Sequence, residues 1–224
     1  MPNKTSINTL ILSDIHLGLK TSRPIEAIKI IESYDFKRLI LNGDIFDSLN
    51  FNRLHTEHWD FLSKIRSISK MREVVWVCGN HDGPALTLSS LLGIKIYKKY
   101  FWHLGDKKLL AIHGHQFDRF LYKNILISKI AVWFYYFAQR LDTKNKFLTH
   151  WLKNHTKSYL RMSEEVKNGA ILYAKLRKAD FVFCGHTHKA EVFKSSKVNY
   201  YNSGSWTTVP SNYIIIKNGN IELK

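Results

Sequence analysis

The sequence is poor in cysteine and contains no long apolar run. Its 224 residues include only Cys78 and Cys184, and each ends a short apolar segment just before a glycine. Two such thiols are typical of small buried side chains in a reduced compartment, and they exclude a disulfide framework as the basis of the fold. The most apolar stretch of the middle region, residues 130–138, is much shorter than the ~20 residues that span a bilayer. We therefore expect no transmembrane segment.

An apolar signal region is also missing from residues 1–7, which lead directly into the first expected strand. Secretion is therefore not expected. The predicted location is the cytoplasm, with peripheral attachment to the inner face of the cytoplasmic membrane as a further expectation.

Acidic residues are scarce relative to basic ones. The 34 Lys and Arg outnumber the 18 Asp and Glu, which gives a formal net charge of +16 and a pI near 9.8. Such a charge predicts an anionic partner: nucleic acid, an acidic membrane surface or a phosphorylated substrate. Hydrophobic residues make up 45% of the chain, which is enough for the core of one domain over residues 1–224.

Five short apolar runs each end in aspartate, asparagine or histidine, mostly beside a glycine. We expect each run to form a buried strand: 10–13, 39–42, 73–77, 109–112 and 181–184. Helical spacing of apolar residues predicts helices over 24–31, 54–69 and 85–92, so the order is that of parallel βαβ units in an α/β fold. Ligands bind at the carboxyl edge of such a sheet, where glycine lets the backbone approach closely. Near the end of the chain, Asn218 and Gly219 predict a hairpin turn.

Residues 119–178 differ from the rest of the chain. They contain no proline, a single glycine at Gly169, and apolar residues at helical spacing. Their 13 Lys and Arg against 3 Asp and Glu give a net charge of +10, most of the charge of the whole chain. We expect a basic helical insertion within the domain.

The residues that follow the five strands have the chemistry of a metal site. Carboxylate, amide and imidazole groups that bind divalent cations occur at seven positions: Asp14, His16, Asp44, Asn80, His113, His186 and His188. Residues i and i+2 of an extended segment point to the same side, so Asp14 with His16, and His186 with His188, are expected to reach into one cavity. Two cations held there would neutralise a phosphate and acidify a bridging water, which predicts in-line attack on phosphorus.

Five motifs occur in a fixed order along the chain: Asp14-x-His16, Gly43-Asp44-x-x-Asp47, Gly79-Asn80-His81-Asp82, His113 and Gly185-His186-x-His188. Together they resemble the motif set of the calcineurin-like metallophosphoesterases, from residue 10 to about residue 206. The resemblance implies a β-sandwich of two mixed sheets flanked by helices, with a binuclear metal centre at one end. Residues 119–178 would then be a helical cap insertion.

The resemblance also implies a role for each site residue. It assigns the seven ligands as follows: Asp14, His16 and His188 to the first metal, Asn80, His113 and His186 to the second, and Asp44 as the bridge. The expected ions are two Mn²⁺, with iron and zinc as alternatives. His81 would stabilise or protonate the leaving oxygen, oriented by Asp47 or Asp82, although an aspartate there also commonly caps the following helix. His115 has no place in the pattern and is predicted to be a pocket or surface residue.

The substrate is a separate question, because a fold and a metal centre fix only the reaction. A basic, apolar insertion, with Phe117-Asp118 shortly after His113, resembles the UDP-2,3-diacylglucosamine diphosphatases of lipid A synthesis and their relatives. Those enzymes release UMP and a diacylated sugar 1-phosphate, so the resemblance implies an apolar cap beside an anionic bilayer surface. The sequence departs from them at His81, where they carry arginine, and at His115, where they usually carry aspartate.

Other interpretations stay open. A nucleotide or nucleic-acid phosphodiesterase or phosphatase would use the same centre, with the positive charge following a phosphate backbone. Nucleic acid is less favoured because the insertion is rich in Trp, Phe, Ile and Leu. The insertion could equally pack on the core as ordinary amphipathic helices. A non-catalytic scaffold with this fold, as in a retromer subunit, is disfavoured because every ligand position and His81 are present.

Overall fold

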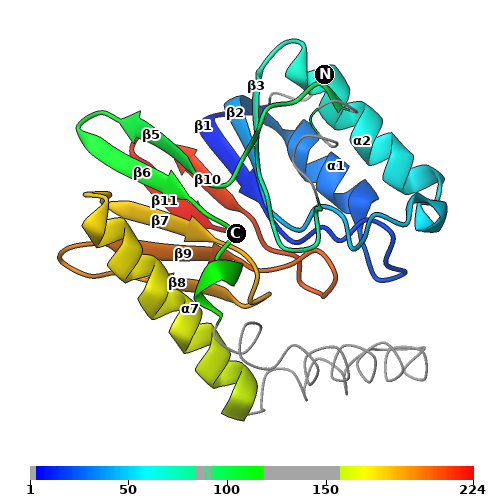
Figure 1. Ribbon diagram of the computed structural model, residues 1–224. Coiled ribbons are helices and arrows are strands. Elements are labelled where there is room, and N and C mark those ends of the chain that lie inside the picture. Colours follow the sequence, from blue (N-terminus) through cyan, green and yellow to red (C-terminus); the bar gives the residue numbers. More distant parts are fainter. Residues whose placement is uncertain (1–3, 84–88, 90–91, 119–156) are drawn as a thin grey trace.

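The computed structural model describes residues 4–83, 89, 92–118 and 157–224. They form two β-sheets that face each other and carry helices on their outer faces (Figure 1). Helices α1 (Pro24–Ser33) and α2 (Thr56–Ser69) cover the first sheet, and α7 (Lys157–Leu176) covers the second. The expected fold, two mixed sheets flanked by helices, is confirmed.

The first sheet has six strands in the order β11-β10-β1-β2-β3-β4. Their bounds are β1 (Thr5–Leu12), β2 (Tyr34–Asn42), β3 (Glu73–Val77), β4 (Ile96–Tyr97), β10 (Ile214–Lys217) and β11 (Asn220–Leu223). Strands β1 to β4 are parallel, and β10 pairs antiparallel with β1. This half of the molecule therefore has the parallel βαβ order that the sequence predicts.

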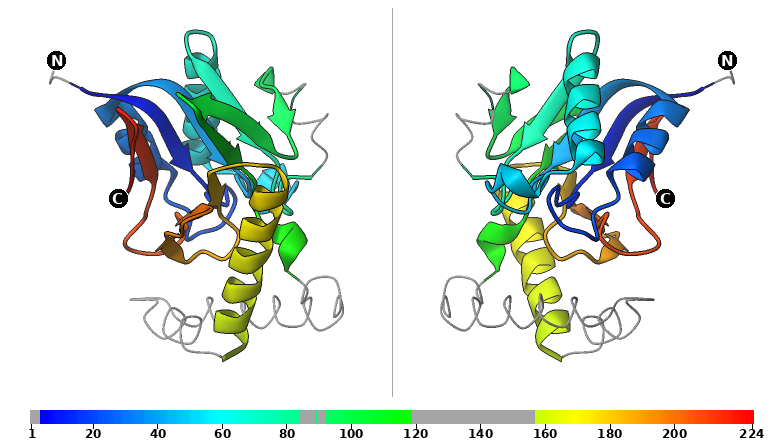
Figure 2. Two further views of the ribbon diagram at one scale, coloured as in Figure 1. Left: turned by 90° about the vertical axis from the view of Figure 1, so that its left-hand side faces the viewer. Right: turned by 90° about the vertical axis from the view of Figure 1, so that its right-hand side faces the viewer.

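The second sheet has five strands in the order β5-β6-β7-β9-β8. Their bounds are β5 (Tyr100–Leu104), β6 (Lys107–Ala111), β7 (Phe181–Cys184), β8 (Ala190–Phe193) and β9 (Asn199–Ser203). Strands β6, β7 and β9 are parallel, and the two edge strands pair antiparallel with their neighbours. Figure 2 shows α7 (yellow) and the pair α1 and α2 (blue and cyan) lying with different sheets.

Side chains alternate between the two faces of each strand, and this alternation fills three apolar cores. In β2, Leu39 and Leu41 belong to the core under α1 and α2, whereas Ile40 belongs to the core between the sheets. In β7, Phe183 packs between the sheets and Val182 packs under α7. Because both faces are buried there, these central strands contain continuous apolar runs, such as 39–41 in β2 and 181–184 in β7.

The expected elements outside the insertion are largely confirmed. All five predicted strands are present, and α1 and α2 lie where helical spacing places them. Asn218 and Gly219 connect β10 to β11 with φ values of 49° and 86°, as a two-residue hairpin turn with left-handed backbone requires. Most of the third expected helix, over 85–92, falls outside the described residues.

Only the last part of the expected insertion can be described, because residues 119–156 fall outside the described residues. Helix α7 packs on the second sheet through Ala170 and Ala174. Phe117, in the short 3₁₀ helix η2 (His115–Phe117), lies against Gly169, where a Cβ would come within 2.8 Å of the phenylalanine side chain. The described end of the insertion therefore packs as an amphipathic helix, and the bounds 119–178 stay a prediction. Within the described residues, no helix has the length and apolarity needed to cross a membrane.

A buried asparagine joins the two sheets beside the loops at one end of the sandwich. Asn42, the last residue of β2, donates a hydrogen bond from Nδ2 to the carbonyl of Phe183 in β7 (3.1 Å). Its own carbonyl oxygen lies 2.9 Å from Nδ1 of His113. The loops that follow β2, β6 and β7 are therefore held together across the sandwich.

Candidate metal centre

Loops that follow β1, β2 and β3 of the first sheet and β6 and β7 of the second meet at this end of the sandwich. The N–H of Asp14 donates to the carbonyl of Gly43 (3.0 Å), and the N–H of Gly185 donates to the carbonyl of His113 (3.0 Å). Across the sheets, the N–H of His186 donates to the carboxylate of Asp14 (3.1 Å). Residues far apart in the sequence are thereby brought to one site.

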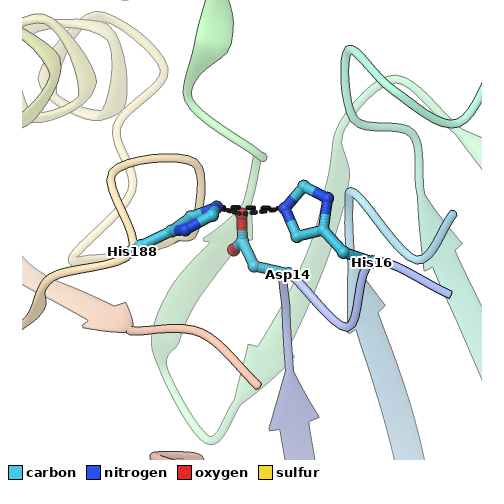
Figure 3. A group of neighbouring side chains, drawn as sticks. All are labelled: Asp14, His16 and His188. Carbon is cyan, nitrogen blue, oxygen red and sulfur yellow. Dashed lines mark hydrogen bonds and ion pairs between the residues drawn. The ribbon is translucent and has the colours of Figure 1, made fainter. Parts of the chain in front are cut away.

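Asp14, His16 and His188 form a first cluster whose side chains point toward one another (Figure 3). Nε2 of His188 lies 3.2 Å from Oδ1 of Asp14 and 3.0 Å from Nε2 of His16. Asp14 and His16 are buried, whereas His188 is half-buried. Three nitrogen and oxygen donors that converge in this way can hold one divalent cation.

Asp44, His113 and His186 form a second cluster. Oδ2 of Asp44 lies 3.2 Å from Nε2 of His113. The same oxygen lies 3.9 Å from Nε2 of His16, which belongs to the first cluster. Asp44 is thus placed between the two clusters, where a carboxylate that bridges two cations would have to be.

The charges of the site depend on one another. Burial raises the pKa of Asp44, but the neighbouring imidazoles, His113 first among them, offset burial and hold the pKa of this carboxyl well below its usual range. Burial lowers the pKa of His113, but Asp44 raises it to about 10. In the same way, the pKa of Asp14 is lowered by His188 against the effect of burial. Two carboxylates buried together need positive charge nearby, which either protonated imidazoles or divalent cations provide.

A metal fits the donor atoms of this site. Nδ1 of His113 contacts the carbonyl of Asn42 and therefore carries a proton in both the charged and the neutral ring, so Nε2 is the nitrogen at which a cation would replace the second proton. This Nε2 is buried and makes no well-aligned hydrogen bond among the described residues, although Oδ2 of Asp44 lies 3.2 Å away. The same holds for Nδ1 of His16, which lies 3.7 Å from Oδ1 of Asp47. A buried nitrogen without a hydrogen bond is costly unless another group, such as a cation, binds it.

The backbone at the site differs from the one that we expected. Asp14 and His16 do reach the same cluster, but neither lies on an extended segment: their φ values are 54° and 52°, in the left-handed region. His186 and His188 are left-handed as well, with φ values of 65° and 56°. The alternation of an extended strand is therefore the wrong reason for their convergence. Residues other than glycine rarely adopt this conformation, and such strain is concentrated at functional sites.

Glycines allow the close approach that the sequence predicts. A Cβ on Gly79 would lie 2.2 Å from Oδ1 of Asp44, and a Cβ on Gly185 would lie 2.3 Å from Oδ2 of Asp14. Neither space accepts a methyl group. The carboxylates thus lie directly against the backbone of a neighbouring loop.

His81 lies at the edge of the site, and its orientation is set by a backbone atom. Nδ1 of His81 lies 2.8 Å from the carbonyl oxygen of Asp47, which leaves Nε2 for another group. The backbone N–H of His81 donates to Oδ1 of Asp44 (2.9 Å). The carboxylate of Asp47 pairs instead with Arg53 (2.6 Å) and lies 3.7 Å from Nδ1 of His16.

Asp82 connects two loops of the site by hydrogen bonds. Its two oxygens accept hydrogen bonds from four donors: the N–H groups of Ile45 (2.8 Å), Phe46 (3.0 Å) and Gly79 (2.8 Å), and Nε1 of Trp76 (3.1 Å). The carboxylate is fully buried, and burial together with Asp44 raises its pKa. Asp82 therefore joins the loop after β2 to the loop after β3.

Two side chains reach the site without having been assigned a role in it. The ring of His115 lies 5.5 Å from that of His113, and burial together with His113 lowers the pKa of His115 to about 4. Asp118 is buried and lies 3.0 Å from Nε2 of His186. The position of Asp118 shortly after His113 in the sequence indicated that it lies near the site, but the sequence alone does not show that it contacts His186.

Asn80, which the sequence predicts as a ligand of the second metal, is exposed.

Comparison with known proteins supports the presence of a metal site in this chain. The profile of the calcineurin-like phosphoesterase superfamily domain matches residues 7–217 of the chain. No curated protein is similar enough in sequence to count as a match.

Solved structures share the fold at low sequence identity. An archaeal phosphodiesterase is 17% identical with a TM-score of 0.54, covering 96% of this chain and 98% of the other. Yfce, a phosphoesterase from E. coli, is 15% identical with a TM-score of 0.51, covering 94% and 88%. A single mutant of Vps29 from Entamoeba histolytica is also 15% identical with a TM-score of 0.51, covering 96% of each chain.

At these identities the solved structures show the fold alone, so the family profile and the two clusters carry the assignment. The profile covers both clusters, from Asp14 to His188. The chain belongs to the calcineurin-like phosphoesterase superfamily, and it is a metal-dependent phosphoesterase.

Proposed function

We propose that the chain is a binuclear-metal phosphohydrolase that cleaves a phosphoester or pyrophosphate bond. The observation that carries the proposal is the position of Asp44, whose Oδ2 lies 3.2 Å from His113 and 3.9 Å from His16. These two imidazoles belong to different clusters. A single carboxylate placed between two sets of ligands suits a pair of cations better than one.

The ligands would divide between the two cations: Asp14, His16 and His188 for the first, Asn80, His113 and His186 for the second, with Asp44 shared. Oxygen and imidazole ligands suit manganese, iron and zinc, and we take Mn²⁺ as the first ion to test. Two such cations would neutralise the charge of a phosphate and would lower the pKa of a bound water, which is the chemistry that in-line attack on phosphorus requires.

His81 is the proposed general acid. Its Nδ1 is held by the carbonyl of Asp47, so Nε2 is the nitrogen that can give a proton to the leaving oxygen. Arg53 holds the carboxylate of Asp47 at 2.6 Å and thereby steadies the loop that orients His81. Asp82 supports the same loop through its hydrogen bonds to Ile45 and Phe46.

The substrate that we propose to test first is UDP-2,3-diacylglucosamine, cleaved to UMP and the diacylated sugar 1-phosphate. Its support is the basic and apolar sequence of the proposed 119–178 cap and the position of Phe117-Asp118 after His113. In the described part of this cap, α7 exposes Leu160, Leu172 and Leu176 at 47%, 58% and 72%. Apolar side chains among lysines and arginines suit acyl chains at an anionic membrane surface.

The test is a comparison of substrates on metal-loaded protein. Protein stripped with a chelator and reloaded with Mn²⁺ is incubated with UDP-2,3-diacylglucosamine, bis-p-nitrophenyl phosphate and single-stranded DNA. Turnover of the lipid in preference to the other two supports the full proposal. Turnover of the generic diester alone leaves a phosphohydrolase and removes the lipid, whereas turnover of DNA favours a nuclease. No hydrolysis of any substrate with Mn²⁺, Fe²⁺ or Zn²⁺ would indicate a scaffold with this fold.

A further inference from the structure

One carboxylate outside the seven proposed ligands lies against one of them. Asp118 directly follows η2, and it is 5% exposed. Its Oδ2 lies 3.0 Å from Nε2 of His186. A buried carboxylate at this distance from an imidazole constrains how the ring is oriented.

The position of Asp118 is fixed by packing. The preceding residue, Phe117, lies against Gly169 of α7, where no room remains for a Cβ. The N–H of Asp118 donates to the carbonyl of His115 (3.1 Å), which closes the turn. The carboxylate therefore approaches His186 from a braced turn on the surface of α7.

The hydrogen bond determines which nitrogen of His186 remains for a cation. An imidazole that is hydrogen-bonded at one ring nitrogen presents the other to a metal. Asp118 occupies Nε2 of His186, so Nδ1 is left for the cluster with Asp44. In His113 the nitrogens are used the other way round, because Nδ1 contacts the carbonyl of Asn42 and Nε2 lies 3.2 Å from Asp44.

We propose that Asp118 is a positioning residue of the metal centre. Its carboxylate accepts the proton of Nε2 of His186 and directs Nδ1 toward the cation that Asp44 and His113 would hold. A carboxylate behind a histidine ligand fixes the tautomer of the ring and raises its basicity, and loss of such a group weakens metal binding about 10–100-fold. The proposal rests on the proposed function, because it takes His186 as a ligand.

A purely structural role for Asp118 makes a different prediction, and the chain offers a matched control. Tyr159 of α7 also contacts the loop that carries His186, but at a backbone atom: its hydroxyl donates to the carbonyl of Thr187 (2.6 Å). If Asp118 only anchors the loop, removing either anchor should have similar effects. If Asp118 positions the imidazole, only its removal should change the binding of a cation.

The experiment measures Mn²⁺ binding rather than turnover. Metal-free wild-type protein, Asp118→Asn and Tyr159→Phe are titrated with Mn²⁺, and free Mn²⁺ is followed by electron paramagnetic resonance. We expect two sites in the wild type and, in Asp118→Asn, one site weakened about 10–100-fold with the other unchanged. Tyr159→Phe should keep both affinities within about two-fold. Titration with Co²⁺, followed by its visible absorption, should show the altered environment at a single site.

Three outcomes overturn the proposal. Wild-type affinities at both sites in Asp118→Asn would show that the carboxylate does not act on the cation, and an equal loss in Tyr159→Phe would reduce it to a loop anchor. If melting shows that Asp118→Asn does not fold, Asp118→Glu decides: it keeps the charge one methylene further out, and an unchanged affinity refutes positioning. A wild-type protein that binds no divalent cation refutes the metal centre itself, and the wild-type titration alone reveals this.

Discussion

The two sheets contribute different chemistry to the metal centre. Loops of the first sheet supply both buried carboxylates of the two clusters, Asp14 and Asp44, together with His16, whereas loops of the second sheet supply histidines alone: His113, His186 and His188. Contacts of 3.2 Å cross between the sheets, from Asp14 to His188 and from Asp44 to His113. The site therefore exists only where the two sheets are packed together.

The two sets of proposed ligands are also held by different groups. The carboxylates of Asp14 and Asp44 accept hydrogen bonds from the backbone N–H groups of His186 and His81. On the second sheet, a side chain contacts the ring of His186, because Asp118 reaches it from the turn after η2. We infer that substitution of a carboxylate of the first sheet abolishes hydrolysis, whereas substitution of a residue that orients a histidine of the second sheet changes the affinity for metal.

The largest effect is expected from Asp44→Asn. The amide has nearly the same shape but cannot supply the negative charge that the two proposed cations would share, so hydrolysis of bis-p-nitrophenyl phosphate with Mn²⁺ should fall about 10³-fold, roughly 4 kcal/mol in activation free energy. The exposed Asp106, in the turn between β5 and β6, provides the matched control. Asp106→Asn should retain wild-type rates. Activity of Asp44→Asn close to that of this control would contradict a bridging role.

His81→Gln should reduce turnover by about 10²-fold while the metal content stays at the wild-type level. The reason is that we propose His81 as the proton donor and not as one of the metal ligands. Its loss should matter more for diesters with a poor leaving group, such as an alkyl phosphate, than for p-nitrophenyl esters, whose leaving oxygen needs little protonation. An equal loss on both kinds of ester, measured with matched metal content, would argue against a general acid.

Glycine substitutions test which sheet is more sensitive to crowding. In Gly79→Ala the new Cβ would lie 2.2 Å from Oδ1 and 2.3 Å from the backbone nitrogen of Asp44, so the backbone itself must move. In Gly185→Ala the nearest atoms belong to the side chains of Asp14 and Ser13. Overpacking costs about 1–3 kcal/mol, and we expect Gly79→Ala toward the upper end and Gly185→Ala toward the lower. Urea unfolding of the metal-free proteins measures the difference.

Gly105→Ala is the control for these two variants. Gly105 has a φ of 57° and no atom within 4 Å of an added Cβ, so only the left-handed backbone is strained, at about 1 kcal/mol. A loss of stability in Gly79→Ala no larger than in Gly105→Ala would show that the loop after β3 accommodates the methyl group. The close approach to Asp44 would then be of no energetic importance.

The sequence predicted the strands and the residues at their ends because both depend on local patterns. The run 73–77 is apolar from Val74 onward and is followed by Gly79, Asn80 and His81, so strand and loop could be assigned together. The antiparallel pairing of β10 with β1 could not be assigned in this way. Pairing between strands that are distant in the sequence leaves no local signal.

The geometry of the site was less predictable than its composition. Left-handed φ values at Asp14 and His186 arise from the loops as folded, because neither residue type requires them. The contact of Asp118 with His186 depends on the packing of η2 on α7, which joins segments separated by residues 119–156. Sequence spacing identifies which residues carry the chemistry, but tertiary packing decides which atoms meet.

The smallest expected effect concerns a buried histidine outside the site. His58 in α2 is 1% exposed, and its Nδ1 accepts a hydrogen bond from the N–H of His55 (3.0 Å). Burial lowers the pKa of His58 below its usual 6.5, although Glu57 opposes this, whereas in His113 the effect of Asp44 exceeds that of burial. The contrast shows that a neighbouring carboxylate, and not burial, decides the direction of the pKa shift of His113.

The sign of the pH effect follows from this lowered pKa. As the pH falls below 6.5, the unfolded chain binds a proton at His58 before the folded protein does. The free energy of unfolding therefore decreases as the pH falls from 6.5 toward the pKa of His58 in the folded protein. Above about pH 7 the ring is neutral in both states, and His58 does not change the free energy of unfolding. His58→Asn removes this titration and should weaken the loss of stability between about pH 7.5 and 5.5. Urea unfolding of both proteins at the two pH values gives the difference, from which the constant cost of the substitution cancels. A steeper loss of stability in the variant than in the wild type would mean that His58 is protonated in the folded protein, and that Glu57 acts on it as Asp44 acts on His113.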